Sequence, residues 1–345
     1  MPELAALVAA LEIGLQRDGF APATDDAPDL VLNILEDEAP RPFRRGSRGT
    51  FVAALQIGER IPVDPLRAGY PILVRALANI AMTYVPEAGV WFTTLERGSY
   101  VVPQTDGVNA LAHDVVERLA PLAAARLVIE NEFRTDLEPE LWAGDDHTAQ
   151  IAAAGRRLDA AGLLPAPFAI EDLVNEHDLR HIRRLYGIGG LSYGNLSERR
   201  DRTRFWMSAS GVDKGKLEIP GRDILLVSGY DADAGAMVLS VPPSVEPRRV
   251  SVDAIEHWQI YERRPDVGAI VHVHGWVAGV AATDVNYPCG SEELAHSVSA
   301  LIDAADDPAH AIVGLRNHGI TATGSTLEEI LDRIEPHLLT QVPMT

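Results

Sequence analysis

The chain has 345 residues, of which 46% are hydrophobic, and it carries a formal net charge of −20. This charge argues against a nucleic acid or an acidic membrane as partner, because phosphate binding depends on dense Lys and Arg. No run approaches the ~18 apolar residues that a membrane span needs. One cysteine, Cys289, and an N-terminus without a basic leader predict a cytoplasmic protein, with a length that suits about two domains.

Residues 1–145 are predicted to form a separate α/β domain, and their sequence carries no motif that indicates a function. Apolar residues recur at helical spacing in some segments and form short Val- and Ile-rich runs in others. The predicted helices cover 4–15, 65–82 and 109–126, and the predicted strands cover 30–35, 50–56, 89–94 and 99–102. The acidic, turn-prone stretch 135–147 predicts a linker after this domain.

Residues 146–345 are predicted to form a second domain, with α/β layers around a mostly antiparallel sheet. Short apolar runs predict strands over 204–207, 224–227, 236–239 and 269–274. Amphipathic segments predict helices over 151–161, 170–186, 252–263, 291–303 and 326–335.

Two histidines in the last of these strands indicate a metal site. His272 and His274 are separated by one residue, so their side chains lie on the same face of an extended strand. His318 follows another apolar run and offers a third imidazole. Three histidines with a carboxylate or an open position form a standard coordination sphere for a divalent metal. The alternative is two unrelated polar residues at a strand end and a histidine in a turn.

A serine- and glycine-rich segment ends in the chain's only two lysines, Lys214 and Lys216. Ser210 and Gly211, just before them, could hold a phosphate or a carboxylate together with a lysine ammonium group. A solvent-exposed loop in a chain biased toward arginine is the alternative explanation.

Two further segments have both a structural and a functional interpretation. Asp253 stands at the start of a predicted helix, where it suits either a helix cap or a carboxylate directed at the metal. His257, one turn later, could chelate with it, although helix packing is the simpler role. The glycine-rich segment 187–197 allows the backbone to approach an anion closely, or forms a flexible turn.

In their order along the chain, these motifs resemble the class II aldolase/adducin family over residues 150–335. The resemblance rests on GGLSYGNLSER, SASGVDKGKL, Asp223 in RDILLV, SVDAIEHWQIYERRPDVGAIVHVHG and LRNHG. It implies a class II aldolase-like α/β/α domain and a homo-oligomer, a tetramer by the family's habit. Residues 1–145 lie outside the resemblance.

The resemblance also implies roles for individual residues. His272, His274 and His318 match the family's metal-binding histidines, which hold zinc (Zn²⁺) or sometimes manganese, iron or cobalt. Asp253 matches an acidic position that is Glu in fuculose- and rhamnulose-phosphate aldolases and Asp in ribulose-phosphate 4-epimerases. By this resemblance the residue binds the metal and serves as acid and base in the aldolases, and it is a metal ligand in the epimerases. We expect Asp253 to be catalytic.

The implied phosphate-binding positions are Asn195, Ser210, Gly211 and Ser251, and Lys214 lies within the same motif. The chain departs from the family at Val252, which replaces a second serine of the phosphate-binding pair. The segment 275–288 is also shorter than in the family, which leaves Asp284 and Tyr287 as candidate pocket residues.

We therefore expect a metal-dependent lyase of the aldol-cleavage type, acting on a small hydroxy-carbonyl compound such as a sugar phosphate. In such a reaction the metal polarises the carbonyl, stabilises an enediolate and works with a carboxylate that moves protons. An epimerase, a dehydratase or a decarboxylase could use the same site. A non-catalytic binding module like the adducin heads is the remaining alternative.

Overall fold

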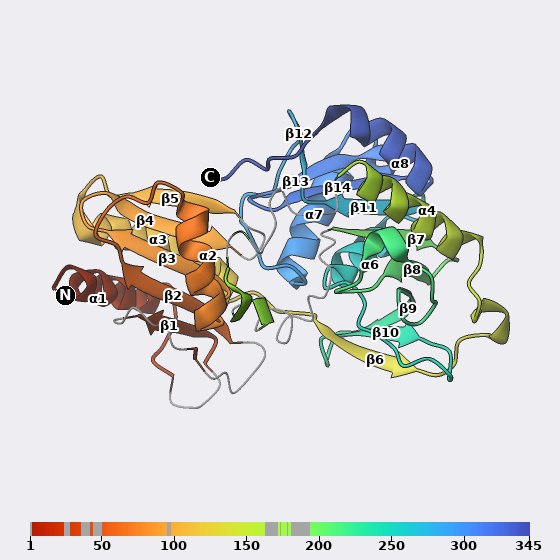
Figure 1. Ribbon diagram of the computed structural model, residues 1–345, viewed down its shortest axis with the longest axis horizontal. Helices are drawn as coiled ribbons and strands as arrows, with labels where there is room; N and C mark the ends of the chain where they lie inside the picture. Colours follow the sequence, from red (N-terminus) through yellow and green to blue (C-terminus); the bar gives the residue numbers. More distant parts are fainter. Residues whose placement is uncertain are drawn as a thin grey trace. The chain divides into compact units, whose positions relative to one another are not determined.

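The computed structural model describes residues 2–23, 28–35, 42–43, 50–94, 98–162, 172, 174–177, 179–180 and 194–345. The chain divides into two compact units. The first is formed by Met1–Ala125 with Ile170–Ile182 and Met344–Thr345, and the second by Arg126–Ala169 and Arg183–Pro343. Each unit has its own sheet, labelled in Figure 1.

The first unit is built on a mixed sheet with the strand order β1-β2-β3-β4-β5. Strands β1, β2 and β3 run parallel to one another, whereas β3, β4 and β5 pair antiparallel. Helix α2 packs on this sheet, and α1 packs against α3. The elements are α1 (Pro2–Arg17), β1 (Leu30–Ile34), β2 (Phe51–Ile57), α2 (Pro65–Ala76), β3 (Ile80–Val85), β4 (Gly89–Thr94), β5 (Ser99–Pro103) and α3 (Gly107–Ala123).

The helix predicted over 65–82 is wrong in its last six residues, 77–82. Helix α2 starts at a cap in which the Asp64 carboxylate accepts a hydrogen bond from Arg67 N, and it ends at Leu77, whose φ is 52°. The chain then enters β3, in which all six residues are buried. A strand buried on both faces has no alternating pattern, so sequence periodicity cannot separate it from a preceding apolar helix.

The second unit is built on an eight-stranded sheet with the order β13-β14-β11-β7-β8-β9-β10-β6. All neighbouring strands pair antiparallel except β10 and β6, which are parallel, so the prediction of a mostly antiparallel sheet is confirmed. The strands are β6 (Glu130–Arg134), β7 (Asn195–Arg199), β8 (Phe205–Ser208), β9 (Ile224–Asp231), β10 (Ala236–Ser240), β11 (Ala269–Val273), β13 (Ile312–Leu315) and β14 (Gly319–Gly324). Strands β12 (Trp276–Val277) and β15 (Leu338–Leu339) form a separate pair.

Helices cover this second sheet and complete the α/β/α arrangement. Helices α4 (Asp146–Ala160) and α8 (Leu327–Ile334) pack on each other and on the strands around β7 and β11. Helices α6 (Ala254–Arg263) and α7 (Glu292–Ala304) pack on each other. The side chains of α6 and of its N-cap residue Asp253 bond to the opposite face of β7 and β14. Short 3-10 turns lie at Pro139–Leu141, Lys214–Lys216, Pro308–His310 and Glu335–His337.

The linker predicted over 135–147 is instead packed on the second unit. Leu137 and Leu141 are buried in the core of this unit, and the Asp145 carboxylate caps α4 by accepting a hydrogen bond from Thr148 N. Acidic and turn-forming residues therefore cap a helix here, in a segment that is packed against the core. The composition of such a segment alone does not distinguish it from a solvent-exposed linker.

Most other predicted elements are confirmed, and a few were missed. The sequence patterns did not indicate β6, β7 or β14 as strands. The helix predicted over 170–186 falls largely outside the described residues. In the part of the chain that the structure describes, no helix combines the length and apolar character required to traverse a bilayer.

Candidate metal centre

The three predicted metal ligands come from two neighbouring strands of the second sheet. His272 lies in β11 and His274 just beyond its end, so the alternation of the strand directs both side chains to one face. His318 lies in the turn between β13 and β14, next to Asn317, which adopts a left-handed conformation with φ 57°. Because β14 pairs with β11, this turn brings His318 beside the other two histidines.

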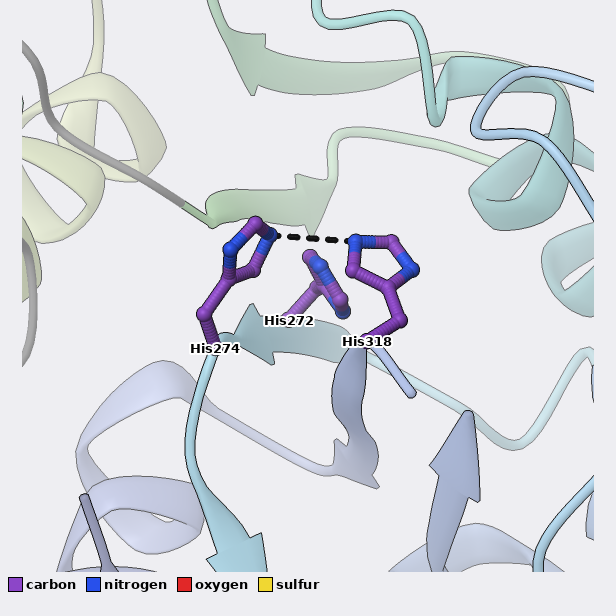
Figure 2. A group of neighbouring side chains, drawn as sticks. All are labelled: His272, His274 and His318. Atoms are coloured by element: carbon purple, nitrogen blue, oxygen red, sulfur yellow. Dashed lines mark hydrogen bonds between the residues drawn. The ribbon is translucent and has the colours of Figure 1, made fainter. Parts of the chain in front are cut away.

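The three imidazoles converge on a common point, as Figure 2 shows. One ring nitrogen of each histidine lies within 4.8 Å of the corresponding nitrogens of the other two. The Nε2 atoms of His274 and His318 face each other at 3.0 Å. The ring centroids are 4.6 to 5.2 Å apart and the rings meet edge to face. The sequence-based grouping of these histidines therefore corresponds to a real cluster.

The protonation state of His272 suits a metal ligand. Its Nδ1 is 3.0 Å from the carbonyl oxygen of Ile320, an acceptor, so Nδ1 carries the proton and Nε2 a lone pair. This Nε2 is buried and has no hydrogen-bond partner among the described residues. Burial lowers the pKa of His272 to about 4, so the ring is neutral near pH 7. A buried, neutral and unsatisfied nitrogen beside two other imidazoles fits a divalent cation.

Two glycines let the backbone approach β11 closely beside the histidines. A Cβ on Gly194, whose φ is +78°, would lie 2.3 Å from the carbonyl oxygen of His272. A Cβ on Gly319 would lie 2.2 Å from the carbonyl oxygen of Val273. Both contacts are far shorter than real Cβ contacts, so the strand that carries the histidines has room only for glycine on either side.

Asp253 occupies the N-cap position of α6 but does not cap the helix. Its side chain makes no capping hydrogen bond and instead accepts one from the Asn195 amide, at 2.7 Å. Asn195 stands directly opposite His272 in the β7–β11 pairing, so the carboxylate lies on the histidine face of the sheet. Asn195 Oδ1 is buried and has no hydrogen-bond partner in the described part of the chain.

A second buried carboxyl group, Glu256, was not identified from the sequence. Thr321, opposite His272 on β14, donates a hydrogen bond to Glu256 Oε1 at 2.6 Å. Burial, and then the charge of Asp253, raise the pKa of Glu256 to about 8. Its spacing of three residues from Asp253 places both on one side of α6, which is a signal the sequence does contain.

His257 belongs to the packing beneath the site. It is buried, its Nδ1 lies 2.6 Å from Ser197 Oγ, and that hydroxyl is 2.9 Å from the Tyr261 hydroxyl. Burial holds the pKa of His257 well below its usual value. These contacts support a packing role for His257.

Of the predicted anion-binding residues, Asn195 lies in β7 and bonds to Asp253, whereas Ser210, Gly211 and Ser251 lie in two segments that pair with each other. Ser210 N donates to the carbonyl of Arg249, and Ser251 N donates to the carbonyl of Ser208, so the segment holding Ser210 and Gly211 runs beside the one holding Ser251. Gly211 has a φ of 67°. Of the glycine-rich segment, residues 187–193 lie outside the described residues.

The two lysines have different environments. Lys214 is 3% exposed, and burial lowers its pKa to about 8, while the charges of Asp253 and Asp213 act in the opposite direction. Lys216 is 80% exposed at its side chain and forms an ion pair with Asp213 at 2.9 Å. Only Lys214 is thus grouped with Asp253.

Comparison with known proteins agrees with the resemblance seen in the sequence. Residues 180–285 match the Class II Aldolase and Adducin N-terminal domain. Methylthioribulose-1-phosphate dehydratase of Gluconacetobacter diazotrophicus is 25% identical over 223 residues, covering 56% of this chain and 89% of that protein. The protein of the same name from Acidiphilium cryptum is 28% identical over 213 residues, covering 54% and 83%. Among solved structures, an L-fuculose 1-phosphate aldolase aligns with a TM-score of 0.39 and 20% identity, covering 56% of this chain and 82% of that one.

Proposed function

We propose that this chain, which carries a class II aldolase/adducin domain, is a metal-dependent lyase for a small phosphorylated hydroxy-carbonyl compound, and that it catalyses a dehydration. One observation carries the proposal: three imidazole nitrogens converge within 4.8 Å on the sheet face that also holds the Asp253 carboxylate. A non-catalytic binding module has no need of a histidine cluster combined with a buried acid.

The residues that would hold the metal are His272, His274 and His318. A divalent cation bound there would act as a Lewis acid on the substrate carbonyl oxygen. The contribution of the chain is to hold the three rings together and, by burial, to keep His272 neutral. The hydrogen bond from His272 Nδ1 to Ile320 fixes one of the rings in the tautomer that ligation requires.

Asp253 is the group we propose to move the proton. Its carboxylate is buried, and it is held by the Asn195 amide rather than committed to the helix cap. In a dehydration, the carboxylate would take a proton from the carbon next to the carbonyl. The protonated carboxyl would then give that proton to the hydroxyl on the following carbon, which leaves as water. General acid–base catalysis of this kind contributes about 10²- to 10⁴-fold in rate.

The phosphate would be held beside Asp253 by Lys214 and the segments containing Ser210, Gly211 and Ser251. The buried ammonium group of Lys214 supplies positive charge in a chain whose net charge is −20. A phosphate bound near it would stabilise the ammonium form and so oppose the lowering of the Lys214 pKa by burial. Local donors thus make an anionic substrate compatible with an acidic protein.

Dehydration is favoured over aldol cleavage by the curated relatives. The two reported above are both named methylthioribulose-1-phosphate dehydratase, and the alignments span 83% or more of their length. Aldol cleavage is the second candidate, because the same carboxylate could accept a proton from a substrate hydroxyl while a carbon–carbon bond breaks.

The test is metal analysis followed by a product assay. Purified protein should hold about one divalent ion per chain, and His272→Ala should lose it while retaining its circular dichroism spectrum. The loaded protein is then incubated with methylthioribulose 1-phosphate and with a panel of ketose and aldose phosphates. Loss of water from a substrate supports the proposal, and two carbonyl fragments would support aldol cleavage. Folded protein that binds no metal would overturn both.

The two lysines provide a matched pair for the phosphate site. Lys214→Met should raise the KM for a phosphorylated substrate, because it removes the buried cation near Asp253. Lys216→Met should leave KM unchanged, because that side chain is exposed and paired with Asp213. Equal KM values in the two variants would exclude Lys214 from the phosphate site.

A further inference from the structure

A hydrogen-bonded chain leads from His272 of the histidine cluster to a buried carboxyl group on α6. His272 Nδ1 is 3.0 Å from the carbonyl oxygen of Ile320 and 3.4 Å from Thr321 Oγ1. Thr321 Oγ1 in turn lies 2.6 Å from Glu256 Oε1. His272, Thr321 and Glu256 are all buried, so water does not compete for these contacts. The proposed dehydration does not use Glu256.

The chemistry of these groups fixes the direction of the chain. The Ile320 carbonyl can only accept, so His272 Nδ1 carries a proton. That N–H also faces Thr321 Oγ1, which therefore accepts there and donates its own proton to Glu256 Oε1. Glu256 Oε2 is buried and has no hydrogen-bond partner among the described residues. Because Oε1 is an acceptor, a proton on this carboxyl group resides on Oε2, and the direction is the same whether Glu256 is ionised or not.

This direction decides which nitrogen of His272 is available to a metal ion. With the proton on Nδ1, the other ring nitrogen, Nε2, keeps the lone pair that ligation needs. The Thr321 hydroxyl can rotate, unlike the backbone carbonyl of Ile320. If position 256 offered no acceptor, this hydroxyl could turn its proton toward Nδ1 and favour the tautomer that is protonated on Nε2. A protonated Nε2 cannot bind a metal ion.

The sheet and α6 together place a carboxyl group on each side of His272. Asn195, His272 and Thr321 stand opposite one another on β7, β11 and β14. Asp253, at the N-cap of α6, bonds to Asn195, and Glu256, one helical turn later, bonds to Thr321. The contact between Glu256 and Thr321 is therefore set by the packing of a helix on a sheet and not by a loop.

We propose that Glu256 is a positioning residue of the metal centre, which accepts the Thr321 hydroxyl proton and so keeps His272 in the tautomer that binds metal. This inference rests on the proposed metal-dependent function and deepens it, because it states how the ligand is prepared before the ion binds. Groups that orient a metal-binding histidine typically contribute about 10- to 100-fold to metal affinity.

Zinc titration of the full chain against a competing chelator tests the acceptor at position 256. Glu256→Leu removes the acceptor and should bind zinc about 10- to 100-fold more weakly. Glu256→Gln should bind zinc like the wild type, because its amide oxygen can still accept the Thr321 proton. Glu198→Leu is the matched control: Glu198 is also buried, but it faces His147 of α4 on the other side of β7. It should bind zinc like the wild type.

A second substitution distinguishes this role from a general packing role. Thr321→Val removes the rotating hydroxyl but keeps the shape of the side chain, and the Ile320 carbonyl still holds the Nδ1 proton. The double variant Glu256→Leu/Thr321→Val should therefore recover most of the zinc affinity that Glu256→Leu loses. Loss of packing alone predicts the opposite, because two buried contacts are then removed instead of one.

Nitrogen NMR of the metal-free protein, labelled at histidine, reads the tautomer directly. The signals of His272 are assigned by their absence from His272→Gln. In the wild type they should show a proton on Nδ1 and none on Nε2, and in Glu256→Leu a fraction with the proton on Nε2. If Glu256→Leu does not fold, the wild-type spectrum still decides, because a proton on Nε2 there would contradict the assigned direction of the chain.

Three further outcomes would overturn the positioning role and leave the proposed function intact. They are wild-type zinc affinity in Glu256→Leu, equal weakening in the Leu and Gln variants, and a double variant that binds no better than Glu256→Leu. Folded wild-type protein that binds no metal would instead overturn the proposed function, and with it this inference. The metal content of the wild type therefore separates the two failures.

Discussion

Individual buried polar side chains determine what the histidine cluster can do. Asn195, His272 and Thr321 form one row across three adjacent strands, and each connects to a different group. Asn195 holds Asp253, Thr321 holds Glu256, and His272 bonds to the carbonyl of Ile320. Asp253, Glu256 and His272 are thereby each oriented by a specific hydrogen bond, so single substitutions should separate their roles.

Asp253→Asn tests the proposed acid–base group. We expect kcat to fall by about 10²- to 10⁴-fold, because an amide cannot accept the proton. Metal content should be unchanged, since the three imidazoles remain. The exposed Asp136→Asn serves as control and should keep its activity. An Asp253→Asn enzyme with normal kcat would remove Asp253 from the mechanism.

Glu256 should make the stability of the metal-free protein depend on pH. Its folded pKa is raised to about 8, whereas an unfolded glutamate titrates near 4.3. Between these values the folded state holds a proton that the unfolded state has released, so stability falls as pH rises through this window. Glu256→Gln, a neutral side chain of similar shape, should remove that slope. Denaturant unfolding at pH 5 and pH 8 measures it, and equal slopes in the two proteins would contradict the assignment.

At this scale the sequence predicted the ligands better than their surroundings. His272 and His274 could be grouped because strand alternation is a local rule, and His318 and Asp253 followed from the family motif. Glu256 and Cys289 were not identified as neighbours of the site, because their approach depends on how α6 and the turn at 288–291 pack. Such contacts between distant segments leave no periodic signal in the chain.

The strands around the site pack closely through their backbones. Substitution of two glycines, one inside this contact and one outside it, tests how much the contact contributes to stability. Gly194 and Gly162 both have positive φ values, +78° and +70°, but only Gly194 has neighbours within 4 Å of a built Cβ. Gly162→Ala should cost about 1–2 kcal/mol for its backbone conformation alone.

Gly194→Ala should cost about 1–3 kcal/mol more, because its Cβ would meet the carbonyl oxygen of His272. It should also weaken zinc binding, whereas Gly162→Ala should not. Thermal unfolding and zinc titration of both variants measure these effects. Equal losses of stability and affinity in the two would show that the contact with β11 is unimportant.

Secondary structure was predictable where the pattern is local and ambiguous where burial is complete. The strand predicted over 269–274 is confirmed up to Val273, as are the antiparallel sheet and the helices over 291–303 and 326–335. Strand β7, which holds Asn195, was missed although four of its five residues are buried. Its sequence, NLSER, is polar, so it carries no apolar run that would indicate a strand. Its polar side chains are buried because tertiary packing brings them hydrogen-bond partners such as Asp253 and His257.

At the scale of the whole molecule, metal should stabilise one unit and not the other. All three histidines lie in the second unit, and the sheet of the first contains none of them. A ligand that binds only the folded state stabilises it by mass action. Removing the metal with a chelator should therefore accelerate hydrogen exchange in β11 and β14 and leave β1–β5 unchanged. Faster exchange throughout both units would show that metal binding is coupled to the fold of the entire chain.

The cross-strand row of Asn195, His272 and Thr321 also has a consequence for folding. A slip of β11 by one residue against β7 or β14 would turn its side chains over. The valines at 271 and 273 would then face α6, and both histidines would face away from Asp253. Only the correctly aligned strand can therefore present the ligands together. A metal ion that binds only this alignment would stabilise the correct strand register. It would thereby lower the population of misaligned states while the sheet assembles.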